Sequence, residues 1–311
     1  MTKVLALAGG VGGAKLAVGL SQILPAENLS IIVNTGDDFI HYGLKICPDL
    51  DTVMYNLAGI SNEEIGWGRN SDTWQCLVEL EQMGCETWFQ LGDKDIANHM
   101  ERTRLLNCGK TLTEATEQLC QRFNVRNRIF PMTDETVSTM INTKEFGWIG
   151  FQEYFVKHKF MPHLIDIKYV GVDKALVCQE TRAYIEEADL VIFCPSNPWL
   201  SIMPILAIDD FKSLIAKKTV IAVSPIVGHA AIKGPAAKIF QEREILPNAA
   251  EVAKLYKGII TGYVLDQQNI DECELIRGWG IIPMVTDTIM TDMDSKKRLA
   301  KEVLDFASQI G

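Results

Sequence analysis

Short apolar runs alternate with segments whose apolar residues recur at helical spacing along most of the chain. The apolar runs predict strands at residues 4–8, 29–34, 87–91, 190–194, 219–224 and 262–265. The helical spacing predicts helices at residues 14–24, 50–57, 72–83, 95–107, 113–123, 174–187 and 295–310. Strands that alternate with helices are typical of a parallel sheet covered by helices, so we expect a Rossmann-like α/β fold.

The middle of the chain departs from this alternation. Between residues 128 and 170, four runs predict successive strands: RIFPM, VSTMIN, WIGFQEYFV and IDIKYVG. We therefore expect a single domain, residues 1–311, with a Rossmann-like core formed by residues 1–127 and 171–311. A smaller β-rich insertion, residues 128–170, would contribute to substrate binding.

Polar turns follow five of the predicted strands. They are GGVGGAK (residues 9–15), NTGDD (34–38), LGDKD (91–95), PSNP (195–198) and SPIVG (224–228). Each turn alone is explained by the polarity of ordinary turns. In an open parallel sheet, however, ligands bind outside the carboxyl ends of the strands. The five turns together predict one ligand-binding cleft.

The glycine loop fits neither of the two common phosphate-binding patterns. In a P-loop counted from Gly9, Ala14 stands where the second glycine should be, and Leu16 replaces the hydroxyl that binds Mg²⁺. In the dinucleotide pattern, Lys15 replaces the third glycine. The loop still has the properties of an anion site, because glycines permit close approach and the following helix offers free N–H groups. We expect it to bind a diphosphate.

Carboxylates form a second group of candidates. Asp37 and Asp38 follow a strand, and Asp49 and Asp51 begin the helix predicted in CPDLDTVMYNLAG. Asp49 is a natural N-cap, and capping alone would explain its presence. Carboxylates that face a diphosphate suggest Mg²⁺, a hard cation that prefers oxygen ligands. They could also include a base for an attacking hydroxyl.

Composition narrows the classes of function. The chain has 311 residues, 47% of them hydrophobic, and a net charge of −10 without a basic tract, so nucleic-acid binding is not expected. Eight cysteines without CxxC pairs favour reduced thiols in the cytoplasm, and no apolar run reaches the length of a membrane span. The histidines show no metal-binding spacing, and we expect all five on the surface or in packing: His41, His99, His158, His163 and His229.

Ten motifs are spread in order over nearly the whole chain: LAGGVGGAKLAVGL, VNTGDD, PDLDTVMY, LGDKDIANHMERT, LTEATEQL, FPMTDETVST, FQEYFV, PSNPWLSIMPIL, VSPIVGHAAIKGPAAK and DTIM. In this combination the chain resembles the phospholactate transferase (CofD-like) family. The resemblance implies transfer of a phosphorylated small acid from a guanosine diphosphate conjugate to the terminal ribityl hydroxyl of the deazaflavin Fo. GMP would be released, in the synthesis of coenzyme F-420. Mg²⁺ would be required, and the protein would be a homodimer.

The resemblance also implies roles for particular residues. Asp51 and Lys94 fall on the Fo-binding pair, although Arg is common at the second position, and lysine lacks its planar fork. Asp38 and Asp51 would hold Mg²⁺, Asp51 would orient the Fo hydroxyl, and Lys15 would stabilise the leaving GMP. These three residues form the expected catalytic set. The nucleotide side would consist of Gly9, Gly10, Gly12, Gly13, Lys15, Asn34, Ser196, Asn197 and Ser224.

Two other functions stay open. A non-catalytic relative that binds a nucleotide or a nucleotide sugar would share the glycine loop and the SNP turn. A Rossmann oxidoreductase would require the glycine that Lys15 replaces. The acid on the donor stays open as well, because lactate, enolpyruvate and glycerate differ by a few atoms.

Overall fold

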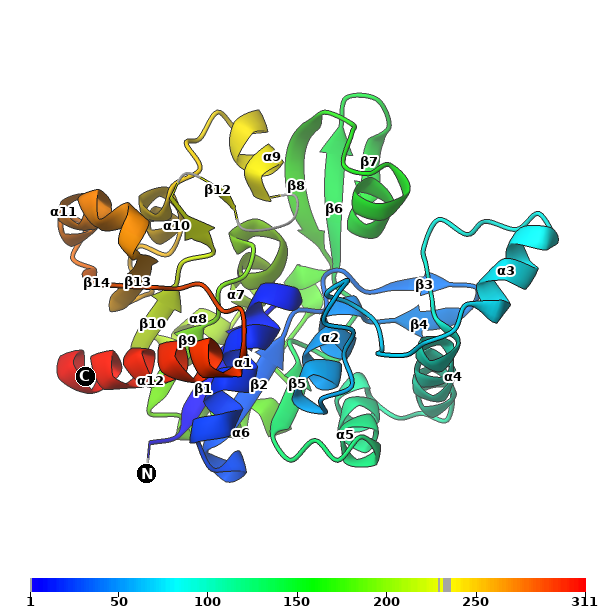
Figure 1. The fold of residues 1–311 in the computed structure, drawn as a ribbon, viewed down its shortest axis with the longest axis horizontal. Coiled ribbons are helices and arrows are strands. Elements are labelled where there is room, and N and C mark those ends of the chain that lie inside the picture. Colours follow the sequence, from blue (N-terminus) through cyan, green and yellow to red (C-terminus); the bar gives the residue numbers. More distant parts are fainter. Residues whose placement is uncertain (1, 229, 232–235) are drawn as a thin grey trace.

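A seven-stranded sheet, in which every neighbouring pair is parallel, forms the centre of the molecule (Figure 1). The computed structural model describes residues 2–228, 230–231 and 236–311. His229 lies outside them. The strands in sheet order are β14 (Ile282–Thr286), β13 (Gly262–Asp266), β10 (Thr219–Val223), β9 (Leu190–Phe193), β1 (Val4–Ala8), β2 (Leu29–Val33) and β5 (Arg128–Pro131). The expected Rossmann-like α/β fold is confirmed.

The central strands are continuously apolar because helices cover both faces of the sheet. Along β1, Leu5 and Leu7 join one core, while Val4, Ala6 and Ala8 join the other. The first core is closed by α6 (Gln179–Glu187), α7 (Met203–Ala207), α8 (Phe211–Ile215), α9 (Ala236–Glu242), α10 (Ala249–Leu255) and α11 (Cys273–Arg277). The second is closed by α1 (Val11–Ile23), α2 (Pro48–Leu57), α5 (Leu112–Arg122) and α12 (Met293–Ile310).

The sheet differs from the prediction in three places. Residues 87–91 form no strand, because Trp88 and Phe89 pack their rings against Phe39 instead of pairing their backbone in a sheet. The run RIFPM was placed in the insertion, but as β5 it pairs with β2 in the main sheet. Strand β14 was not predicted at all, although it pairs with β13 along its length.

The β-rich insertion is a separate three-stranded antiparallel sheet at one end of the molecule (Figure 1). It contains β7 (Gly147–Gly150), β6 (Ser138–Thr143) and β8 (Leu164–Val170) in that order. The run WIGFQEYFV does not continue as a strand after β7. Its second half turns into a helix whose π-helical part is Glu153–Lys157, and Phe151 and Phe155 stack on one face of it.

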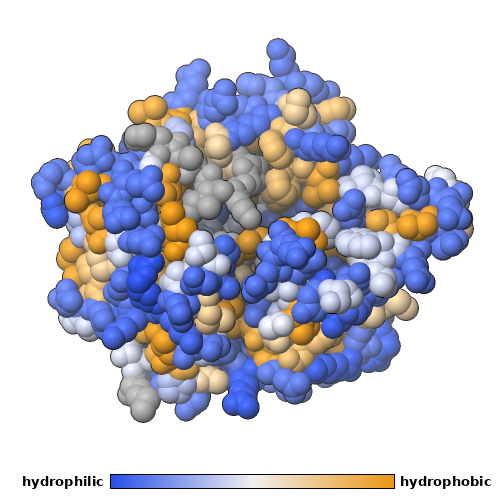
Figure 2. Space-filling model, in the orientation of Figure 1, coloured by the Kyte–Doolittle hydropathy of each residue, from blue (hydrophilic) through white to orange (hydrophobic). Residues whose placement is uncertain are grey.

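A hairpin and two helices form an arm that extends away from the sheet at the right of Figure 1. It comprises β3 (Phe39–His41), β4 (Leu44–Ile46), α3 (Gln75–Gln82) and α4 (Asp93–Asn107). Helix α3, at the outer end, buries none of its residues fully. Apolar surface is visible at this end of the molecule (Figure 2), and Val78 and Met83 are among the exposed apolar side chains. The outer end of the arm, formed by α3, therefore contributes little stability through burial of apolar surface.

The strand order places the site. From β1 the chain adds β2 and β5 on one side of the sheet, and then β9, β10, β13 and β14 on the other. The turns after β1 and β9 therefore diverge from neighbouring strands and leave a crevice between them, where ligands bind in open α/β sheets. The glycine loop and the PSNP turn occupy these two positions.

The two turns approach each other so closely that glycine is required. Helix α1 begins at Val11, three residues before the predicted start, so Gly12 lies in its first turn. A Cβ atom on Gly12 would lie 2.3 Å from the carbonyl oxygen of Pro195, and one on Gly9 would lie 2.2 Å from Ser201 Oγ. The glycines at these positions make room for neighbouring protein atoms.

We expect Gly12→Ala to lower the free energy of unfolding by about 1–3 kcal/mol, because its methyl group would overlap a backbone oxygen that cannot rotate away. Urea unfolding of both proteins measures the difference. Gly150→Ala is the matched control, since no atom lies within 4 Å of its Cβ position. Equal stability of the two variants would contradict the close approach.

Candidate active site

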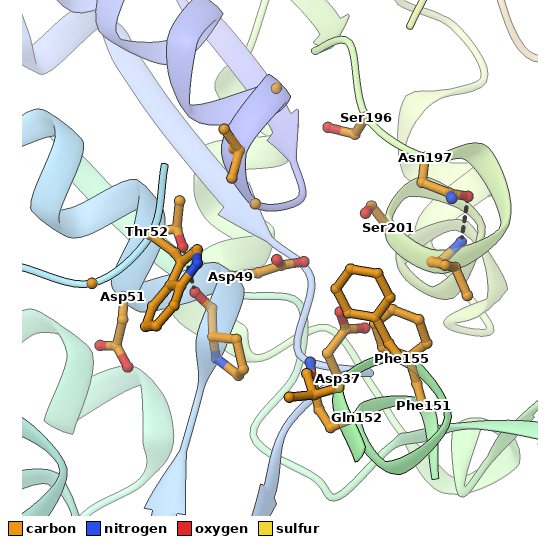
Figure 3. Close-up of a pocket in the computed structure, with 18 of the residues that line it drawn as sticks. Asp37, Asp49, Asp51, Thr52, Phe151, Gln152, Phe155, Ser196, Asn197 and Ser201 are labelled. Atoms are coloured by element: carbon orange, nitrogen blue, oxygen red, sulfur yellow. Dashed lines mark hydrogen bonds between the residues drawn. The ribbon is translucent and has the colours of Figure 1, made fainter. Parts of the chain in front are cut away.

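One cavity of about 1100 Å³ opens where the strand order reverses. Its walls come from the turns after β1, β9, β10 and β14, from helices α2 and α4, from the segment 88–91 and from the helical turn after β7. Serine side chains lie on one side of it, Asp49 near the middle, and Asp51 and Thr52 on the other side (Figure 3). Four of the five predicted polar turns follow strands of the sheet. The fifth, LGDKD, begins α4.

The turn after β9 presents hydrogen-bond donors to the cavity. Ser196 Oγ accepts from the backbone N–H of Gly9 at 3.1 Å, which leaves the hydroxyl proton for a ligand. Asn197 Oδ1 accepts from the N–H groups of Trp199 and Leu200, so the amide orientation is fixed. Asn197 Nδ2 is buried and has no hydrogen-bond partner in the described part of the chain. Both predicted residues line the cavity.

Two further hydroxyls line the same side. Ser224, at the end of β10, was predicted, and its hydroxyl donates to the carbonyl oxygen of Ile226 at 3.1 Å. Ser201 was missed. It lies on the helical turn Pro198–Ile202, with its Oγ beside Gly9. Ser201 follows the capping residue Asn197 by about one helical turn, and Ser196 directly precedes Asn197. This spacing in the sequence would have indicated that both serines lie at the same site.

The N-terminus of α1 points its free N–H groups into the crevice. Its first turn contains neither a side-chain cap nor an acidic residue. Of the residues predicted in the glycine loop, Gly10, Gly12 and Lys15 line the cavity, whereas Gly9 and Gly13 do not. Lys15 Nζ donates to the backbone oxygen of Met290 at 2.9 Å, in a segment that follows β14 and also lines the cavity. The lysine is thereby tethered at the edge of an anion-binding helix end.

Asp49 lies against the glycine loop and shares an amide with Asp37. A Cβ on Gly10 would lie 2.6 Å from Asp49 Oδ1. Asn34 Nδ2 donates to Asp37 Oδ1 at 2.8 Å and to Asp49 Oδ2 at 2.9 Å, so Asn34 organises this buried group. Burial raises the pKa of Asp49 to about 7. Burial, and then the charge of Asp49, raise the pKa of Asp37 well above its usual range.

Asp49 is not the N-cap that the sequence suggested. Helix α2 begins at Pro48 with Cys47 in the capping position, and no side chain caps it. Asp49 is inside the first turn and points at the loop instead. Because capping does not account for its position, a role in the site is the better explanation.

Asp38 faces a different, smaller cavity of about 380 Å³, whose wall it shares with Asp37. Lys45 Nζ lies 3.0 Å from Asp38 Oδ2. Burial raises the pKa of Asp38, and Lys45 partly opposes that rise. Asp38 is not in the lining of the main cavity, so the structure does not bring it together with Asp51 there.

Asp51 lines the main cavity but is already paired. Arg102 donates to both carboxylate oxygens, from Nη1 to Oδ2 at 3.0 Å and from Nη2 to Oδ1. Asn98 Nδ2 donates to Oδ1 at 2.8 Å. A carboxylate with three donors is rigid and has little capacity left for a metal ion.

Aromatic side chains form the rest of the wall. Phe151 and Phe155 lie with ring centroids 5.4 Å apart and planes 10° apart, and Phe160 continues the stack. Trp67 and Trp88 also line the cavity. Flat rings of this kind suit a planar heterocycle.

Lys94 differs most from its expected place. Lys94 is exposed and outside the lining, with Nζ donating to the backbone oxygens of Asn70 and Ser71. His99, which was expected in packing or on the surface, is buried, and it also lines the cavity. Its place on the α4 face of Asp95 and Asn98 was readable from helical spacing.

The donor set suits a hard cation. In the described part of the chain no group of three or more His, Cys, Asp and Glu side chains has the arrangement of a protein-only metal site. Mg²⁺ needs only one or two carboxylates when phosphate oxygens complete its shell. Asp37 and Asp49 fit that requirement at the glycine loop. Burial and neighbouring carboxylates raise the pKa values of both residues, and a cation beside them would favour their ionised forms. The prediction for Asp38 and Asp51 stays a prediction.

Comparison with known proteins identifies the family. The sequence model described as 2-phospho-L-lactate transferase CofD matches residues 4–304. The chain belongs to this family. A phosphoenolpyruvate transferase of Streptomyces coelicolor is 38% identical over 99% of both chains. A 2-phospho-L-lactate transferase of Methanocaldococcus jannaschii is 35% identical, also over 99% of both. The resemblance drawn from the motifs is therefore confirmed.

A solved structure supports the architecture alone. The crystal structure of a UPF0052 family member from Bacillus halodurans has a TM-score of 0.65 at 13% identity, covering 98% of this chain and 99% of that one.

None of the helices among the described residues has the length and apolar character that a membrane crossing requires. The chain is thus a CofD-family transferase with a Rossmann-like sheet.

We expect Asp49→Asn to stabilise the ligand-free protein at pH 8 but not at pH 4. The unfolded chain ionises this carboxyl near pH 3.8, whereas the folded protein keeps it protonated up to about pH 7. Stability is therefore lost as the pH rises between these values, and asparagine removes the loss. Thermal unfolding in a chelator, at several pH values, measures the effect, of the order of a few kcal/mol.

The matched control is Asp209→Asn, at an exposed position. It should leave the pH dependence of stability unchanged. If the stability difference between Asp49→Asn and wild type were the same at pH 4 and pH 8, the raised pKa of Asp49 would be refuted.

Proposed function

We propose that this transferase moves a phosphorylated small acid from a guanosine diphosphate conjugate to the terminal ribityl hydroxyl of the deazaflavin Fo, and releases GMP. The family and the relatives named for phospholactate and phosphoenolpyruvate transfer support the reaction class. The observation that carries the proposal is one continuous cavity. It joins the phosphate cradle, formed by the glycine loop and the PSNP turn, to the aromatic wall, formed by Phe151, Phe155 and Phe160. A guanosine donor and a deazaflavin acceptor, each with a planar ring, require both the phosphate cradle and the aromatic wall.

The nucleotide diphosphate of the donor binds at the glycine loop. Free N–H groups at the start of α1, the hydroxyls of Ser196 and Ser201 and the amide of Asn197 surround this space. Lys15 lies one turn along the helix, where its charge would stabilise the leaving GMP. Phosphoryl-type transfer depends on such positioning and neutralisation more than on a covalent nucleophile.

Fo binds along the aromatic wall. Its planar ring would stack on Phe151 and Phe155, and its polar ribityl chain would reach toward Asp51 and Thr52 on α2. Asp51 then accepts a hydrogen bond from the terminal hydroxyl and orients it. Lys94 contributes to Fo binding only if its contacts with Asn70 and Ser71 are exchanged for contacts with the ligand.

The transfer step is a substitution at phosphorus. The hydroxyl oxygen of Fo forms a bond to the phosphorus that carries the acid, and the bond from that phosphorus to the bridging oxygen breaks. GMP leaves with the bridging oxygen, and the hydroxyl proton is released to water. The product is a phosphodiester between Fo and the acid.

Mg²⁺, where bound, supplies charge neutralisation for the diphosphate. Asp37 and Asp49 are the residues that we expect to hold it, in place of the predicted Asp38 and Asp51, because Asp38 faces the smaller cavity and Asp51 is already bound by Arg102 and Asn98. Asn34 keeps the first two carboxylates in place through its amide. The family resemblance further suggests a homodimer in the cytoplasm, which the mass in solution and cell fractionation would test.

Incubation with Fo, Mg²⁺ and each of three donors, the lactyl, enolpyruvyl and glyceryl guanosine diphosphates, should release GMP with one of them. Mass spectrometry of the Fo product identifies the acid. Omission of Fo, or addition of a chelator, should stop the release. Binding of the donors without GMP release would instead favour a non-catalytic nucleotide-binding relative.

Ser201→Ala should raise the KM for the donor by roughly 5- to 10-fold and leave the KM for Fo unchanged, because one hydrogen bond to a charged phosphate is lost. Initial-rate kinetics with each substrate varied in turn measure both values. Ser308→Ala, on the exposed side of α12, is the control. An unchanged donor KM in Ser201→Ala would exclude this hydroxyl from phosphate binding.

A further inference from the structure

Arg102 is among the largest fully buried side chains of the protein, with 1% of its surface exposed. It lies on α4 behind Asp51 and is not in the lining of the cavity. Burial lowers the pKa of Arg102, but the neighbouring charges and hydrogen bonds, those of Asp51 foremost, together raise it by more, so the guanidinium stays charged. A charge buried at this depth is expensive unless it is paired and hydrogen-bonded.

The guanidinium fixes the plane of the Asp51 carboxylate. Its two terminal nitrogens contact the two carboxylate oxygens, which is the planar, bidentate arrangement that only arginine provides. Asn98, one turn earlier on α4, donates to Oδ1 from the same helix at 2.8 Å. Asp51 is on α2, so the contacts join two helices across a sequence separation of 51 residues.

Counting lone pairs shows what is left for a ligand. A carboxylate offers about four acceptor positions, and Arg102 and Asn98 use three of them. The remaining position is on Oδ2 of Asp51, and Asp51 is the member of this group that borders the cavity. One acceptor in a fixed orientation suits one hydroxyl donor.

His99 completes the arrangement and shows why the carboxylate does not rotate. His99 Nδ1 lies 3.1 Å from Arg102 Nη1. Because arginine only donates, Nδ1 must accept, and the ring carries its proton on Nε2. The contact between His99 Nδ1 and Asp51 Oδ2, at 3.6 Å, is too long for a hydrogen bond, so the ring braces the guanidinium and leaves Oδ2 to a ligand.

We propose that Arg102 is a positioning residue for the transfer reaction: it never touches a substrate, and it holds Asp51 so that the free position of Oδ2 receives the attacking hydroxyl. This inference rests on the proposed function, in which Asp51 orients the terminal hydroxyl of Fo. Asp51 acts in it as a fixed, charge-balanced hydrogen-bond acceptor.

Arg102→Lys is the main test, because lysine keeps the charge but cannot bind both carboxylate oxygens in one plane. The expected result is a roughly 10- to 100-fold lower kcat, with the KM for the guanosine donor changed by less than about twofold. Arg104→Lys is the matched control on the same helix, since Arg104 is exposed and pairs with Glu101. It should retain the wild-type kcat.

A double-mutant cycle separates positioning from a merely structural role. Asp51→Asn and Arg102→Gln are each expected to lower kcat, and the double variant should be no slower than the slower single one, because both changes remove the same interaction. If the two effects multiplied instead, the arginine would act independently of Asp51, and the proposal would be overturned. Melting temperatures and Fo fluorescence titrations confirm that each variant is folded and binds Fo.

Asn98→Ala covers the case in which the arginine variants do not fold. It removes one donor to Asp51 without leaving a buried charge unpaired, and a several-fold lower kcat with an unchanged donor KM is expected. Wild-type kcat in folded Arg102→Lys or Asn98→Ala, with an impaired Asp51→Asn, would refute the positioning role alone. Wild-type kcat in Asp51→Asn would instead refute the proposed role of Asp51.

Discussion

The contact between the turn after β1 and the turn after β9 is the constraint on which the site depends. The two strands are neighbours in the sheet, and the chain leaves them in opposite directions. The space that side chains would fill at Gly9, Gly10 and Gly12 is occupied by Ser201, Asp49 and the backbone oxygen of Pro195. The glycines therefore let the walls of the crevice meet, and the anion-binding end of α1 is exposed to the cavity as a result.

The buried carboxylates around this crevice divide by their partners. Asp38 faces Lys45, and Asp51 is held by Arg102, so both are neutralised within the protein. Asp37 and Asp49 share only the amide of Asn34, and no ion pair in the described part of the chain reaches them. Repulsion and burial are therefore concentrated beside the phosphate cradle, where a cation that arrives with the diphosphate would relieve them.

The aromatic wall of the cavity is built differently from the polar turns around the glycine loop. Its rings come from two irregular segments, the helical turn after β7 and the residues that precede α4. Neither belongs to the main sheet. The turns of the parallel sheet present backbone and short polar side chains to the cavity, while the insertion and the arm supply a flat apolar wall. A transferase with two ring-bearing substrates needs both kinds of surface in contact.

Local patterns were sufficient for much of this protein. Apolar runs and helical spacing identified five strands of the sheet at nearly their final bounds and RIFPM as a strand, and the turns after β1, β9 and β10 were recognised as parts of one site. These features depend on neighbours in the sequence, because strand and helix periods are set by the backbone. The family followed from the motifs.

Contacts between distant segments decided the rest. The apolar run at residues 87–91 contributes side chains to packing and forms no strand. RIFPM joins the main sheet, because strand pairing depends on which edge of the sheet is free. Which carboxylate meets which cation also depends on the fold: Asp51 on α2 finds Arg102 on α4 only because the fold brings these two positions, 51 residues apart in the sequence, together. The sequence determined the elements and the chemistry available, and the tertiary structure decided which charges are balanced and which face the ligand.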